Sequence, residues 1–149
     1  MIHFEGDKLI PRPLAEVSAK LSDAGYLVNC LPDSQITEAT PDRAAWSLRP
    51  KLSFLTGSLH ATMDVTAREA AKAAAFKIAT KAMGAGSTVN VGLTFAETAD
   101  GATAVHWTGD IVEVTGLLKM VPKGTMQGAA QKVIEDVWKA VIEKVSAGG

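Results

Sequence analysis

The amino-acid sequence predicts an α+β fold in which antiparallel strands are followed by one long C-terminal helix. Two patterns carry this prediction. Apolar and polar residues alternate along several segments between residues 36 and 114, as they do in half-buried strands. From residue 126 to residue 145, apolar residues instead recur at helical spacing on one face. Because this helix can bury its apolar face only by lying across the sheet, we expect a curved sheet that grips it and a cavity between the two.

The composition of the chain fits a single soluble domain spanning residues 1–149. The formal net charge is −1 and the basic residues are scattered, so no nucleic-acid partner is expected. The lone cysteine, Cys30, excludes an internal disulfide and is expected to be a small buried residue. The N-terminus lacks the features of a secretion signal, and no segment has roughly 20 apolar residues in a row. We therefore expect a cytoplasmic protein with no stable membrane insertion.

The N-terminal third is expected to hold one strand and two short helices. The strand runs from Ile2 to Leu9, where apolar and polar residues alternate. Pro13 suits the first turn of a helix that continues to Leu21. Asp23 can cap a second helix, which ends at Pro32.

The middle of the chain is predicted to be a series of strands. Alternation with a period of two places them at residues 36–40, 44–48, 55–65, 76–80, 89–95 and about 102–114. In the last strand the alternation falters after Ile111, which indicates a bulge near Gly109. Thr80 falls in the inward phase of its strand, and Glu113 is a second candidate for an inward polar side chain.

The C-terminal helix has the clearest pattern in the chain. Its apolar stripe consists of Met126, Ala130, Val133, Ile134, Val137, Trp138, Val141, Ile142 and Val145. About 28 residues would span roughly 42 Å, enough to cross the predicted sheet. Pro122 and Gly124 lie near its start, so we expect irregular first turns.

At this point the chain resembles a known family. The ordered set Pro13, Val17, Leu21, Asp23, Leu27, Cys30 and Pro32 resembles the opening of the carbon monoxide dehydrogenase CoxG family, within the SRPBCC superfamily of helix-grip, START-like domains. Later positions agree with it, namely Pro50, Gly57, Gly101, Ala102, Thr103, Trp107, Gly116, Gly128 and Ala130. The resemblance implies a seven-stranded antiparallel sheet around the long helix, with a hydrophobic cavity beneath it. It also implies carriage of a lipid-like or quinone-like molecule, or membrane recruitment of a molybdenum CO dehydrogenase.

Residue types that commonly carry catalysis or bind metals do not form a constellation in this sequence. His3, His60 and His106 lie in the phase opposite the apolar residues of their strands and are expected to face outward, so no metal site is predicted. In the family's strand order, His3 and His106 lie on neighbouring strands. Glu135 and Asp136 fall on the polar face of the helix, where solvated charges are usual. We expect no catalytic residue and no cofactor.

The inward-facing residues can either fill a core or line a pocket. Low aromatic content, 5%, and many Ala and Gly residues favour a pocket, because small side chains fill the space beneath a curved sheet poorly. The candidate cavity residues are Trp46, Leu59, Met63, Phe76, Ile78, Thr80, Leu93, Phe95, Trp107, Met126, Ala130, Ile134 and Trp138. The sequence thus predicts a binder of a small hydrophobic molecule without catalysis of its own, and a protein is a further candidate partner. Two alternatives stay open: a cyclase- or hydrolase-type enzyme of the same superfamily, and a protein-interaction module.

Overall fold

The computed structural model describes residues 2–32, 34–49 and 57–148. In chain order its elements are β1 (Ile2–Ile10), α1 (Leu14–Leu21), α2 (Ala24–Cys30), β2 (Gln35–Ala39), β3 (Arg43–Leu48), β4 (Leu59–Glu69), β5 (Ala73–Ala82), β6 (Ala85–Glu97), β7 (Thr103–Gly116), the 3₁₀ helix η1 (Leu117–Met120) and α3 (Lys123–Ser146). The predicted α+β class and the two short helices after the first strand are confirmed. The strand predicted at 55–65 begins at Leu59, and positions 55 and 56 lie outside the described residues, as does Pro50.

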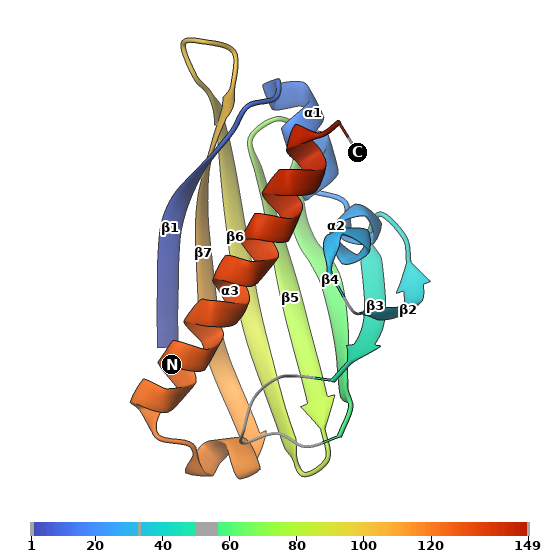
Figure 1. Cartoon of the computed structure of the whole chain (residues 1–149), viewed down its shortest axis with the longest axis vertical. Helices are drawn as coiled ribbons and strands as arrows, with labels where there is room; N and C mark the ends of the chain where they lie inside the picture. Colours follow the sequence, from blue (N-terminus) through green and yellow to red (C-terminus); the bar gives the residue numbers. More distant parts are fainter. Residues whose placement is uncertain (1, 33, 50–56, 149) are drawn as a thin grey trace.

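All seven strands form one antiparallel sheet in the order β1-β7-β6-β5-β4-β3-β2. The first strand therefore pairs with the last one, while β2 forms the opposite edge. Helix α3 crosses one face of this sheet diagonally, and α2 lies over the β3–β4 side of the same face (Figure 1). This is the gripped-helix architecture that the resemblance implies.

The strand register gives the sheet an inner face, toward α3, and an outer face. On β7, for example, Val105 and Trp107 are buried on the inner face, whereas His106 between them is exposed. Their partners on β1 follow the same rule, since Gly6 pairs with Trp107 and the exposed Asp7 pairs with His106. Strict alternation thus carries the inner and outer sets across the whole sheet.

Helix α2 begins as the sequence predicts. The backbone N–H of Tyr26 donates to the Asp23 carboxylate at 3.0 Å, which satisfies one of the unpaired donors of the first turn. Pro13 lies at the N-cap of α1, one residue before the predicted first turn.

The bulge in β7 lies three residues beyond its predicted place. Ile111 pairs with Val89 and Glu113 pairs with Thr88, so Val112 is the extra residue. The extra residue returns Glu113 to the outward phase, where it is exposed. The prediction of an inward Glu113 is wrong, because alternation alone does not show at which residue the phase changes.

Helix α3 has 24 residues, fewer than predicted. The expected irregular start is a separate 3₁₀ helix, and Pro122 lies at the N-cap of α3. Gly116, with a φ of 61°, turns the chain out of β7, and a Cβ there would lie 2.0 Å from the carbonyl oxygen of Gly84. The N–H of Leu117 donates to that same oxygen at 2.7 Å, so η1 is held against the β5–β6 turn.

Candidate functional site

All thirteen candidate cavity residues lie on the inner face of the sheet or on the apolar stripe of α3, but their burial divides them. The buried members are Trp46, Met63, Phe76, Leu93, Phe95 and Trp107. The half-buried members are Leu59, Ile78, Thr80, Met126, Ala130, Ile134 and Trp138. Their inward placement is confirmed, and their contact with a ligand stays a prediction.

The buried members belong to a region that we call the packed half. It lies where α1, α2 and the last turns of α3 meet the sheet, and it contains Ile10, Val17, Leu21, Val28, Val105, Val141 and Val145. These side chains form one hydrophobic cluster with the buried candidates. Enlarging a side chain there would strain neighbours that already fill the space.

Polar contacts fasten the end of α3 to α2 in the packed half. The Lys144 ammonium donates to the carbonyl oxygen of Asn29 at 3.3 Å and lies 5.2 Å from the centre of the Tyr26 ring. Burial raises the pKa of the Tyr26 hydroxyl to about 12. Burial also raises the pKa of the Cys30 thiol, whose Sγ lies 3.4 Å from the Tyr26 carbonyl oxygen. The prediction that Cys30 is a small buried residue is confirmed.

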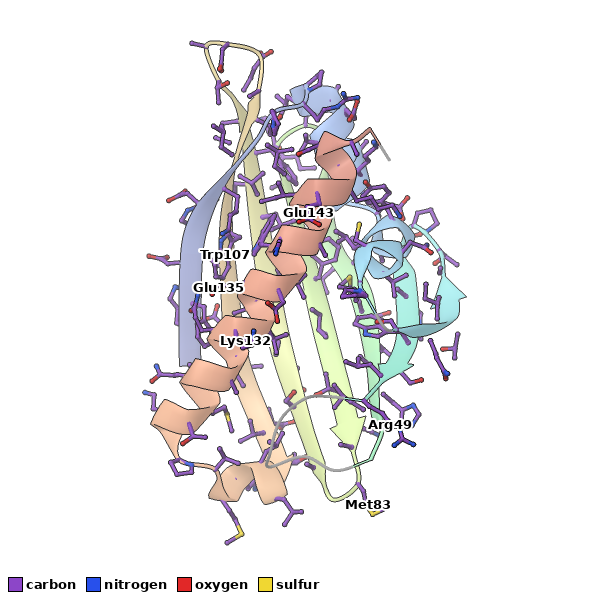
Figure 2. The ribbon with its side chains drawn as sticks, in the orientation of Figure 1. Arg49, Met83, Trp107, Lys132, Glu135 and Glu143 are labelled. Carbon is purple, nitrogen blue, oxygen red and sulfur yellow. The ribbon has the colours of Figure 1, made fainter. Side chains whose placement is uncertain are left out.

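The half-buried members belong to a second region, the uncovered half. It comprises α3 from Lys123 to Trp138 and the inner face of the strands near the β5–β6 turn, including Leu59, Ile78, Thr80, Val89 and Val91. Val133 on the helix is 47% exposed. Two side-chain pairs here run along the helix, Gln131 with Glu135 at 3.3 Å and Lys132 with Asp136 at 3.4 Å. Glu135 and Lys132 point away from the sheet (Figure 2).

The polar residue predicted on this inner face, Thr80, has a partner on the neighbouring strand. The hydroxyl oxygens of Thr80 and Ser87 are 2.5 Å apart. One hydroxyl donates to the other, so one of the two hydrogens remains available. The pair is a candidate polar anchor for a molecule in the uncovered half.

Trp107 lies on the inner face of β7, where the strand faces α3 (Figure 2). Its ring extends over Gly6 of β1, where a Cβ would approach Nε1 to 2.9 Å. The rings of Trp107 and Trp138 are tilted by 41° with centroids 6.4 Å apart. The indole N–H has no hydrogen-bond partner, and no other buried side-chain N or O atom in the described residues lacks one. The sequence could not reveal this atom, because alternation places a side chain on a face without showing which polar atoms find partners.

The outer face carries the histidines, all of which are exposed as predicted. His3 Nδ1 lies 2.6 Å from Asp110 and Nε2 lies 3.2 Å from Glu5, and these hydrogen bonds raise the pKa of His3. His106 contacts Asp7 at 2.9 Å instead of His3, although both histidines lie on neighbouring strands. Within the described ranges, no group of three or more potential metal ligands is found.

Two shallow depressions lie on the surface away from the predicted cavity. One is lined by residues at the β4–β5 turn, and the other lies between α2 and the turn after β2. Neither contains a candidate cavity residue. The uncovered half is therefore defined by its half-buried apolar side chains. Among the helices in the described part of the chain, none is both long and apolar enough to span a bilayer.

The sheet, the gripped helix and the apolar inner face define a helix-grip protein of the START-like class. A family model matches residues 6–146, and the chain belongs to the carbon monoxide dehydrogenase CoxG family. Family and fold together place it with proteins of the hydrophobic-ligand-binding type in general.

Solved structures show the same fold at low sequence identity. A conserved protein from Geobacillus kaustophilus is 17% identical, with a TM-score of 0.84 over 98% of this chain and 96% of its own. A START superfamily protein from Mycobacterium smegmatis is 11% identical, with a TM-score of 0.70 over 99% of each chain. Protein Ms6760, also from Mycobacterium smegmatis, is 13% identical, with a TM-score of 0.65 over 97% of this chain and 88% of its own. No curated protein matches the chain significantly.

Proposed function

We propose that this protein binds and carries a small hydrophobic molecule, lipid-like or quinone-like, between the sheet and the N-terminal part of α3. The observation that carries the proposal is the uncovered half. Apolar residues there face inward from both sheet and helix, yet Ile78, Ile134 and Trp138 are only half-buried. Service to a CO dehydrogenase-type system, as the family name suggests, belongs to this proposal.

The physical argument rests on incomplete burial of inward-facing apolar surface. Removing such surface from water stabilises a complex by roughly 25 cal/mol per Å². Binding sites for small molecules are mostly apolar and contain a few polar groups. The uncovered half has this character, with the Thr80–Ser87 pair beside Ile78 and Val89. An apolar molecule would bury what the protein itself leaves half-exposed.

The enzyme alternative lacks the group that would have supported it most directly. Glu113, the inward carboxylate predicted from the sequence, is exposed on the outer face. An acid or base on the inner face would have to come from another residue.

A protein-interaction function is the second candidate, because exposed apolar side chains gather at one end. Met83 is 85% exposed and Met120 is 81% exposed. Leu117 is also exposed and is held to the β5–β6 turn through its N–H. A contiguous apolar surface of this kind is a common site of protein contact.

The test compares two tryptophan substitutions at neighbouring positions of β5. Ile78→Trp should fill space in the uncovered half, so the affinity for a neutral fluorescent probe such as N-phenyl-1-naphthylamine should fall at least tenfold. Lys77→Trp adds the same side chain on the outer face and should leave probe affinity unchanged. Both variants should melt close to the wild type, whereas Met63→Trp in the packed half should cost about 1–3 kcal/mol.

Native mass spectrometry of the freshly purified protein would identify any co-purified molecule. If the wild type bound no apolar probe and Ile78→Trp were as destabilising as Met63→Trp, the uncovered half would be ordinary core. The protein-interaction function would then be the better explanation.

A further inference from the structure

We propose that the indole N–H of Trp107 donates a hydrogen bond to a carbonyl oxygen of the bound molecule. The ligand class is then an apolar molecule with a neutral carbonyl group, and Trp107 is the residue that selects it. This inference rests on the proposed function and adds the polar feature that the ligand must carry.

The first observation is the unsatisfied donor. Trp107 is 6% exposed, and Nε1 is the single buried side-chain N or O atom without a partner in residues 2–32, 34–49 and 57–148. Buried donors are nearly always satisfied, because leaving one unpaired costs the free energy of its desolvation. An acceptor brought by the ligand would remove that cost, and indole has no acceptor role to compete with donation.

The second observation is the location of the donor at the border between the two halves. Nε1 lies over Gly6, whose missing side chain leaves the ring against the backbone of β1. On the helix side the neighbour is Trp138, which is half-buried and belongs to the uncovered half. Since Nε1 does not touch solvent, a ligand oxygen must displace an apolar neighbour. Trp138, which borders the uncovered half, is the side chain that has to move.

The chemistry of the donor favours a neutral acceptor. One indole N–H supplies one hydrogen bond and no charge, which suits a carbonyl oxygen and leaves a buried carboxylate without a counter-ion. Lys8 lies two residues from Gly6 on the same face of β1 and pairs with Val105. Its ammonium is the group that would serve a carboxylate, so the experiment includes an acid.

Three probes with one tricyclic skeleton test the inference: fluorene without an acceptor, 9-fluorenone with a carbonyl group, and fluorene-9-carboxylate with a charge. We expect 9-fluorenone to bind the wild-type protein about tenfold tighter than fluorene, as one rescued buried donor would give. In ¹H–¹⁵N spectra, the Trp107 indole proton should move downfield with 9-fluorenone and not with fluorene. Trp107→Phe should remove this signal and the tenfold preference, while fluorene still binds.

The outcomes separate the two proposals. Equal affinity for fluorene and 9-fluorenone, with the same indole shift, would overturn the hydrogen bond and leave the proposed function standing. Failure of the wild type to bind any of the three probes would overturn both. Tightest binding of the carboxylate would overturn the neutral ligand class and point to Lys8. The wild-type spectra decide the hydrogen bond even if Trp107→Phe fails to fold.

Discussion

The two ends of helix α3 carry the same apolar stripe but lie in different surroundings. Val141 near the C-terminal end is 3% exposed, whereas Val133, two turns earlier, is 47% exposed. Both positions belong to the stripe that the sequence predicts to face the sheet. The comparison teaches that helical periodicity shows which face seeks cover, while the amount of cover depends on what other elements supply.

The difference comes from what lies next to each end. At the C-terminal end, α1 and α2 contribute Val17, Leu21 and Val28, all fully buried, and Lys144 binds the end of α2. At the N-terminal end, the hydrogen-bonded side-chain pairs of α3 run along the helix itself. The first end is a core, and the second end has the apolar surface on which the proposed function depends.

The largest effect should come from placing the same carboxylate at three positions along the stripe. Val141→Asp buries an unpaired charge in the packed half and should cost several kcal/mol, enough to unfold a marginally stable domain. Val137→Asp, at a half-buried position, should cost less, and Val133→Asp should cost below about 1 kcal/mol. Chemical denaturation measures the series. Equal losses at Val141 and Val133 would remove the distinction between the two halves.

A smaller loss is expected from Gly6→Ala, at the border of the two halves. The new Cβ would lie 2.9 Å from Nε1 of Trp107, so the ring has to shift toward α3. We expect a cost of about 1–3 kcal/mol from this overpacking. The Trp107 indole signal should also move in the absence of any probe. A Gly6→Ala protein with wild-type stability would mean that the ring has free space on the helix side.

The smallest effect is expected from Gly128→Ala, on the N-terminal part of α3. Nothing lies within 4 Å of the position that a Cβ would take. Ala is favoured over Gly in a helix interior, so the substitution should stabilise the protein by about 0.5–1 kcal/mol. Thermal melting measures the gain. A loss of stability instead would show that this part of α3 packs more closely than the uncovered half implies.

Much of the fold could be predicted because alternation and capping are local. Asp23 caps α2 because its side chain reaches an N–H only three residues along the chain. The extents of β5 and β6 were harder to predict. Residues 73–75 are alanines and residues 85–87 are small, so they show no alternation, and only pairing with neighbouring strands makes them part of the sheet. The bulge at Val112 likewise depends on the register with β6.

By itself, the sequence determined the class of fold, the inner and outer faces, and which residues could form a site, because these follow from periods of two and 3.6. The tertiary structure decided how completely each inward residue is buried, because that depends on elements far apart in the chain. It also placed Trp107 over Gly6, about 100 positions away, with its N–H unpaired. Whether a polar atom finds a partner is a property of the packed surroundings, so this part of the candidate site had to come from the structure.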